Sequence, residues 1–204
     1  APDALIAIML SPLLSKLAKA APGIDLGTRN ILPPWTDAFA DLDARGCDIL
    51  LLPRIDFPAR FVTHVLFEER FVVAMRRGHR LGRAPDLERY CAEKHLLVSD
   101  IGDPFGHVDI ALAKQGLARR VALTVPNFLM ALAVISQTDI VAALPESLVA
   151  AYANRFDLVS APLPFVLERD WIHAVAPQVA MADEGLAWLM SILQTVPRGS
   201  KLPR

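Results

Sequence analysis

The feature of this sequence that most restricts its fold is an alternation of short apolar, β-branched runs with stretches of helical periodicity. Residues 48–52, 95–99 and 120–125 are such runs, and helical stretches that end at Gly46 and Gly116 precede the first and the third. This alternation is typical of βαβ units, in which helices cover a parallel sheet. We therefore predict an α/β fold with a largely parallel sheet.

The first thirty residues carry two local predictions. Residues 3–20 have helical periodicity, but Pro12 would break an ordinary helix, so Ser11-Pro12 predicts a new N-cap followed by proline at the first helical position. The stop signal Ala21-Pro22-Gly23 ends this stretch. Apolar and polar residues then alternate through Ile24, Leu26 and Thr28, which predicts a strand.

The remaining pattern predicts further strands and helices in alternation. The strands are 61–67, 70–75, 95–99, 120–125, 139–144 and 171–175, and the helices are 35–45, a short one capped by Asp86, 108–115, 127–137, one opened by Pro145, and 181–194. Residues 158–166 are extended and interrupted by proline, which predicts an edge strand or a connection.

Two lobes account for this order. We assign residues 1–75 and 169–195 to lobe I, 76–168 to lobe II and 196–204 to a tail, whose VPRGS resembles most of a thrombin recognition site. The chain would cross between lobes near Arg70–Met75 and again near Glu168–Ala176. A lobe inserted into another leaves a cleft, which is where ligands bind in such folds.

Composition excludes several classes of protein. With 53% hydrophobic residues among 204, the chain can form a sizeable core, yet its unbroken apolar runs, such as residues 4–10, are far below the roughly 20 residues of a membrane span. The net charge of -1 gives no general surplus for DNA. The densest basic stretch, residues 76–83, is interpreted as a solvated loop, with a phosphate or acidic-partner contact as the alternative.

No catalytic or metal-binding pattern is present in the sequence. The five histidines lack HxxxH or HExxH spacing, and there is no GxSxG turn or P-loop. Cys47 and Cys91 form neither a disulfide framework nor a CxxC pair, which suits a reducing cytoplasm. We therefore predict a cytoplasmic protein that is not an enzyme, with no cofactor, no metal and no membrane contact.

Several segments, taken in order, resemble the effector-binding domain of LysR-type transcription regulators. They are SPLL at 11–14 with APGIDL at 21–26, GCDIL at 46–50, FVVAMRRGH at 71–79, VALTVPNF at 121–128 and IVAALP at 140–145. The family usually has Pro-Leu after the Gly-His, where this sequence has Arg80-Leu81. The likeness extends over residues 3–194 and is nearest to the nodulation and aromatic-catabolism regulators.

The resemblance implies the type 2 periplasmic-binding-protein fold, a two-lobed α/β architecture with an effector cleft between the lobes and two crossover strands. It implies a small-molecule effector and a homodimer or tetramer, with 5–20 and 108–118 as candidate dimer helices. DNA would be bound only through an N-terminal winged helix-turn-helix that this sequence lacks. The first strand is expected to be missing or truncated, because residues 1–3 resemble the loop that follows it.

By the same resemblance, the effector touches loops at strand ends and the start of a helix. The candidates are Pro2, Asp3, Leu32, Ser99, Phe105, His107, Pro126, Asn127 and Phe128. A helix N-terminus suits a carboxylate or phenolate, and phenylalanines could form an apolar wall. Each has a structural alternative: Asp3 and Asn127 as helix caps, Phe128 as core, Ser99 as a turn residue, and His107 as a solvated or capping residue.

Two other functions compete with the regulatory one. A transport-type solute-binding protein would share the fold, and a signal peptide in the upstream gene sequence would favour it. The third hypothesis is that the protein is an α/β enzyme with an unrecognised site. Turnover of a metabolite that is lost on mutation of Ser99 or His107 would favour that reading.

Overall fold

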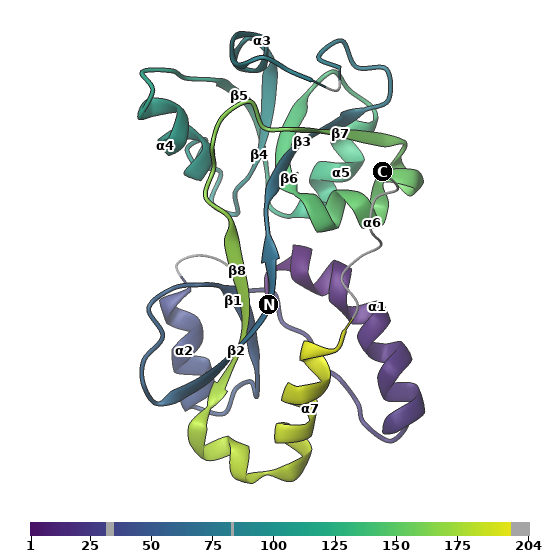
Figure 1. Ribbon diagram of the computed structural model, residues 1–204, viewed down its shortest axis with the longest axis vertical. Helices are drawn as coiled ribbons and strands as arrows, with labels where there is room; N and C mark the ends of the chain where they lie inside the picture. The colour runs from purple at the N-terminus through teal and green to yellow at the C-terminus, as the bar shows by residue number, and fades with distance from the viewer. Residues whose placement is uncertain (32–34, 83, 197–204) are drawn as a thin grey trace. The chain divides into compact units, whose positions relative to one another are not determined.

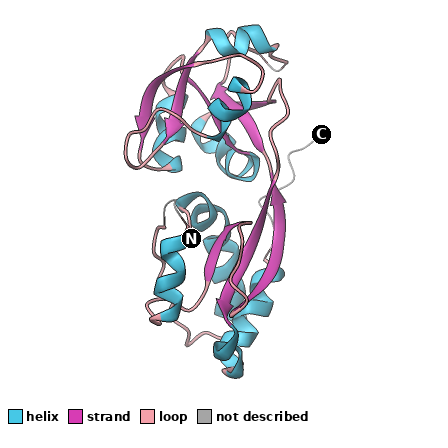
Figure 2. Cartoon of the chain, turned by 90° about the vertical axis from the view of Figure 1, so that its left-hand side faces the viewer, coloured by secondary structure: helices cyan, strands magenta, loops and turns pink. Residues whose placement is uncertain are grey.

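The computed structural model describes residues 1–31, 35–82 and 84–196, which form two compact α/β units (Figures 1 and 2). Unit 1 contains Ala1–Glu69 and the described residues from Asp170 onward, and unit 2 contains Arg70–Arg169. The expected first boundary, after Met75, differs from the observed one because the strand that contains Met75 pairs only within the sheet of unit 2.

Unit 1 contains a three-stranded sheet in the order β1-β8-β2, and both pairs of strands are antiparallel. The aromatic side chains of Phe39 and Phe61 stack in its core, with ring centroids 5.2 Å apart. The elements are α1 (Asp3–Ala20), α2 (Thr36–Asp43), β1 (Leu50–Pro53), β2 (Phe61–Glu69), β8 (Asp170–Pro177), a 3-10 helix η1 (Gln178–Ala182) and α7 (Glu184–Gln194).

The prediction of a largely parallel sheet is wrong for unit 1. The strand expected at Ile24–Thr28 does not form, and this segment has no regular secondary structure. Ile24 is 39% exposed, so the alternating residues bury little apolar surface. Alternation marks a strand only where a neighbouring strand accepts its backbone hydrogen bonds.

Helix α1 also differs from its prediction, because it continues through Pro12 without a new N-cap at Ser11. Proline lacks the N–H that would bond the carbonyl of Ile8, a loss that normally breaks a helix. Here the buried side chains Leu5 and Leu13 lie on either side of Pro12, and their packing offsets that loss.

Unit 2 contains a five-stranded mixed sheet in the order β5-β4-β6-β3-β7. Strand β4 runs parallel to β5 and β6, whereas β3 runs antiparallel to β6 and β7. The predicted parallel arrangement therefore holds for three strands, and β7 is an edge strand as expected. The elements are β3 (Phe71–Arg76), α3 (Leu87–Ala92), β4 (Lys94–Val98), α4 (His107–Ala113), β5 (Arg120–Val125), α5 (Phe128–Ser136), β6 (Val141–Pro145), α6 (Glu146–Phe156) and β7 (Leu158–Pro162).

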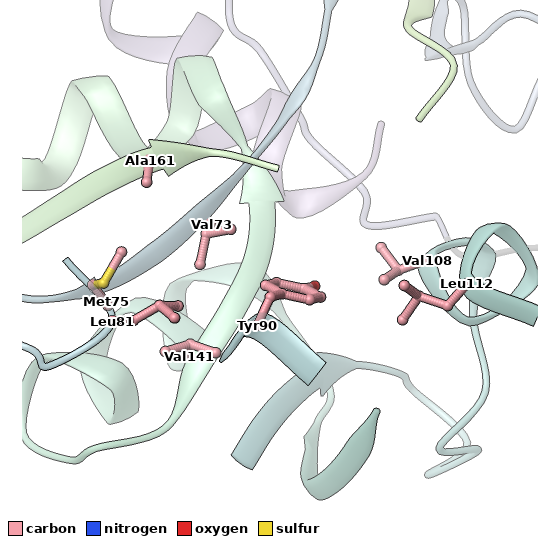
Figure 3. Close-up of a cluster of buried hydrophobic side chains, with 8 residues drawn as sticks. All are labelled: Val73, Met75, Leu81, Tyr90, Val108, Leu112, Val141 and Ala161. Atoms are coloured by element: carbon pink, nitrogen blue, oxygen red, sulfur yellow. The ribbon is translucent and has the colours of Figure 1, made fainter. Parts of the chain in front are cut away.

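A buried cluster joins this sheet to helices α3 and α4. Tyr90 of α3 is fully buried, and its ring lies between the side chains of the sheet and those of α4 (Figure 3). The cluster comprises Val73, Met75, Leu81, Tyr90, Val108, Leu112, Val141 and Ala161. It fixes α4, the helix that follows the glycine loop, against the sheet.

The Gly-His turn after β3 is held by hydrogen bonds. Gly78 has a φ of +75°, which favours glycine. The Leu81 N–H donates to His79 Nδ1 at 3.1 Å, so Nε2 carries the proton and donates to the Asp139 carbonyl at 3.3 Å. His79 is thus a satisfied core residue, and this explains the Gly-His pair of the sequence.

Three arginines of the basic stretch, Arg76, Arg77 and Arg80, are paired with carboxylates of the same unit. Arg76 lies 2.5 Å from Asp139, and Arg77 lies 2.6 Å from Asp157. Arg80 and Glu93 are bridged in the same way, at 2.7 Å. These contacts do not favour the alternative of a phosphate site there.

His95 in β4 is a buried titratable residue. Its Nε2 donates to the Tyr90 carbonyl at 2.8 Å, and its Nδ1 has no hydrogen-bond partner in the described structure. Loss of hydration lowers the pKa of His95 to about 4, so the folded protein holds this imidazole neutral.

We predict that this depressed pKa makes unit 2 less stable in mild acid. The His95 side chain binds a proton near pH 6.5 in the unfolded chain and only near pH 4 in the folded one. The contribution of the neutral imidazole to the free energy of unfolding is therefore complete above pH 6.5 and is lost as the pH falls from 6.5 to 4. From pH 7 to pH 5 the loss should be about 2 kcal/mol. Urea unfolding followed by circular dichroism measures it, and His95→Gln should lack this part of the pH dependence. If the free energy of unfolding of His95→Gln fell equally between pH 7 and pH 5, the effect could not be assigned to His95.

Candidate functional site

The carboxyl ends of the parallel strands define one edge of the sheet in unit 2. Strands β4, β5 and β6 end at this edge, and the antiparallel β3 begins there, because Phe71 pairs with Pro145. Loops at the carboxyl ends of parallel strands are where α/β folds bind ligands. This edge is therefore the candidate site in unit 2.

The loop after β4 carries two of the candidate residues. The Ser99 N–H donates to the Val125 carbonyl at 2.8 Å, which extends the pairing of β4 with β5 by one residue. Asp103 Oδ1 accepts the Phe105 N–H at 3.0 Å and turns the loop. Phe105 itself is 57% exposed, so its ring is available for contact.

His107 begins α4 and packs against the first residue of β3. Its ring meets the Phe71 ring edge-on, with centroids 4.6 Å apart. The residue is solvent-exposed, yet surrounding protein desolvates the imidazole and lowers its pKa, and the charge of Arg119 adds to this effect. At neutral pH His107 is therefore an uncharged group with one donor and one acceptor.

Asn127 is the N-cap of α5, which is the role given to it above as the alternative to effector binding. Its Oδ1 accepts the Met130 N–H at 2.9 Å. Pro126 before it is exposed and Phe128 after it is half-buried. These three residues follow β5, next to the loop that begins at Ser99.

Six of the nine candidates thus lie along one edge of a single sheet. They are Ser99, Phe105, His107, Pro126, Asn127 and Phe128. Pro2 and Asp3 belong to unit 1, and Leu32 lies outside the described residues. Pro2, not Asp3, occupies the N-cap position of α1, and its carbonyl accepts the Leu5 N–H at 3.0 Å.

Two groups at this edge were missed in the sequence. Phe71 was assigned only to the crossing strand, although it contacts His107. Arg70 makes a bidentate pair with Glu146 at 2.6 Å, and its carbonyl accepts the Glu146 N–H at 2.8 Å. Finding them requires the antiparallel direction of β3, which local sequence patterns do not reveal.

An ion pair between Arg119 and Asp109 supports α4. Arg119 Nε and Nη2 donate to the two Asp109 oxygens at 2.9 and 3.0 Å, and the side chains are 1% and 10% exposed. Asp109 Oδ2 also accepts the Gly106 N–H at 2.9 Å. The Gly106-to-Asp109 spacing of a capping box could have suggested Asp109, whereas no sequence signal identifies Arg119.

Comparison with known proteins decides the family. The family model described as the LysR substrate binding domain matches residues 1–198. The chain belongs to this family. It is 26% identical over 184 residues to the transcriptional activator NagR of a Ralstonia species, covering 90% of this chain and 60% of NagR. It is 27% identical over 199 residues to nodulation protein D 1 of Rhizobium tropici, covering 94% of this chain and 62% of that protein.

These relatives, a transcriptional activator and a nodulation protein, agree with the predicted likeness to regulators of this kind. The chain spans about 60% of the length of the curated relatives it matches. The relatives are regulators of transcription.

Solved structures of regulatory and effector-binding domains confirm the fold. The regulatory domain of MexT, a transcriptional activator in Pseudomonas aeruginosa, is similar with a TM-score of 0.81 and 27% identity, over 96% of this chain and 94% of that one. The effector binding domain of QuiR, solved with shikimate, has a TM-score of 0.62 and 13% identity over 89% and 90% of the two chains. The fold is thus that of a LysR effector-binding domain.

Within the ranges described above, no three His, Cys, Asp or Glu side chains lie close enough to hold a metal ion. None of the helices in that part of the chain is long and apolar enough to cross a bilayer.

We predict that Asn127→Ala destabilises the protein by about 1 kcal/mol, because the Met130 N–H loses its acceptor. Asp86→Ala is the matched comparison: Asp86 caps α3 of the same unit and accepts the Arg89 N–H at 2.8 Å. Urea unfolding should give similar losses for both variants. A loss well below that of Asp86→Ala would show that Asn127 contributes little as a cap.

Proposed function

We propose that this LysR effector-binding domain senses a small aromatic or acidic molecule at the carboxyl edge of the sheet in unit 2. The observation that carries the proposal is the gathering of six candidate residues, contributed by two loops and two helices, at that edge. Pro2, Asp3 and Leu32 stay candidate effector contacts on the strength of the family resemblance alone.

The chemistry of the edge supports this ligand class. The exposed Phe105 ring and the half-buried Phe128 ring offer apolar surface to an aromatic group. His107, uncharged at neutral pH, and Ser99 can orient a carboxylate, hydroxyl or phenol through hydrogen bonds. The start of α5 adds backbone N–H groups that favour an anion. The complex of QuiR with shikimate is an example of a small hydroxylated acid bound by a domain of this fold.

In the longer regulator, effector binding would change DNA binding by a separate winged helix-turn-helix domain. A ligand shifts such an equilibrium only by its difference in affinity for the two arrangements. The resemblance to NagR and nodulation protein D 1 supports this role. We place the protein in the cytoplasm, where promoter DNA is found, and assign it no catalytic activity.

We further propose that the domain forms a homodimer or tetramer through α1 and the region around α4. Helix α1 exposes Leu14 at 47% and α4 exposes Ile110 at 49%, and Leu117, in the connection that follows α4, is 37% exposed. Exposed apolar side chains on a helix are a feature of association surfaces.

We predict that Leu14→Glu combined with Ile110→Glu lowers the oligomeric state, because each change would place a charge in the apolar contact. Sedimentation equilibrium measures the mass. Val179→Glu is the control, since Val179 is 82% exposed but lies on η1. An unchanged mass in the double variant would rule out these helices as the interface.

We predict that a small aromatic acid raises the melting temperature in a concentration-dependent way. The panel contains benzoate, phenol and a flavonoid, and a ligand at 100 times its Kd should add about 2.7 kcal/mol of stability. The rise should be strongly reduced in Asn127→Ala and in Phe128→Ala.

Asp86→Ala controls for the loss of a helix cap, because it removes the same kind of hydrogen bond from α3. It should keep the full ligand-dependent rise. A rise of equal size in wild type, Asn127→Ala and Phe128→Ala would place the ligand elsewhere. No rise with any compound would reject this ligand class.

A further inference from the structure

A desolvated network links the core of unit 2 to the candidate site. Arg119 lies in the connection from α4 to β5, and its side chain is 1% exposed. Its guanidinium donates hydrogen bonds to both carboxylate oxygens of Asp109, and its Nη1 donates to the Tyr90 hydroxyl at 3.3 Å. Asp109 in turn accepts the Gly106 N–H, one residue before His107.

Stability alone gives a weak reason for this arrangement. Desolvation of two charges offsets most of their attraction, and apolar residues of similar volume often replace a buried pair without loss of stability. A planar guanidinium that binds a carboxylate through two parallel hydrogen bonds instead fixes orientation. Arg119 therefore sets the orientation of Asp109, and with it the start of α4.

The backbone at Gly106 leaves little room for this segment to shift. A Cβ at this position would lie 3.2 Å from Leu97 Cδ1, a contact tighter than nine in ten real ones. The chain thus passes close to β4 immediately before His107, and the Asp109 carboxylate holds it there. Phe105 on one side of Gly106 and His107 on the other both depend on this anchor.

We propose that Arg119 is a positioning residue for effector binding, which acts through Asp109 and Gly106 to hold Phe105 and His107 in place at the sheet edge. This inference rests on the effector site proposed above. Arg119 makes no contact with the effector itself. Its charge also favours the neutral form of His107, whose pKa is lowered first by desolvation and then by Arg119.

The test uses Arg119→Met combined with Asp109→Leu, which removes both charges and so avoids leaving one buried and unpaired. The variant should fold with a melting temperature near that of wild type, while its affinity for benzoate, measured by calorimetry, falls at least tenfold. Amide hydrogen exchange at residues 100–109 should accelerate at least tenfold, with β6 and β7 unchanged. Arg119→Lys keeps the charge without the two-pronged geometry and should lose affinity to an intermediate degree.

The control removes a similar pair from the same unit. Arg80→Met with Glu93→Leu breaks the bidentate contact between Arg80 and Glu93, and it should leave benzoate affinity within twofold of wild type. Unchanged exchange at 100–109 in the Arg119 and Asp109 double variant would overturn the proposal, as would unchanged affinity. If wild type does not bind benzoate, benzoate is not a ligand of the site, and the exchange measurement alone decides the role of Arg119.

Discussion

Unit 2 depends on the hydrogen bonding of one strand, β3, along both of its edges. It pairs antiparallel with β6 on one side and with β7 on the other, and its residues Val73, Ala74 and Met75 are fully buried. Because β3 runs against the parallel strands, its first residue arrives at their carboxyl ends. This single reversal brings Phe71 to the edge where Ser99, Pro126 and Pro145 also lie.

Buried polar side chains in unit 2 are accommodated in two ways, as neutral groups with hydrogen bonds or as a charge paired with an opposite charge. His79 satisfies both ring nitrogens with backbone groups, and it holds a turn. His95 satisfies one, and it remains neutral because desolvation opposes its charge. Arg119 cannot shed its proton, so it needs a carboxylate, and Asp109 provides one at the start of α4. The charged solution occurs beside the candidate site, where a fixed orientation matters more than a small gain in stability.

Sequence patterns predicted the elements of unit 2 well, because each was marked by local chemistry. The Asp86 and Asn127 caps, the β-branched run of β5 and the edge strand β7 that ends at a proline all express short-range rules. Patterns failed where distant contacts decide the outcome. Pro12 lies within a continuous helix because packing on either side holds it, and the segment at Ile24 pairs with none of the strands in the described part of the chain.

The residues of the candidate site also fall into those marked by local chemistry and those placed by distant contacts. Asn127 could be read from cap chemistry and Phe105 from its glycine loop, but Phe71 and Arg119 act through residues far away in the sequence. His107 and Phe71 are separated by 36 positions, and only the direction of β3 places their rings 4.6 Å apart. Such pairs need a topology before they can be predicted.

The position of Phe71 also bears on how a ligand signal could leave the site. Strand β2 of unit 1 ends at Glu69 and β3 of unit 2 begins at Phe71, so Arg70 alone connects the two strands. Arg70 is held by both oxygens of Glu146, the first residue of α6. At the proposed site, a ligand that moves His107 would act on the Phe71 ring, which is adjacent to the covalent link at Arg70 that the ion pair with Glu146 holds. A ligand regulates through such a link only when its affinity differs between two arrangements of the link.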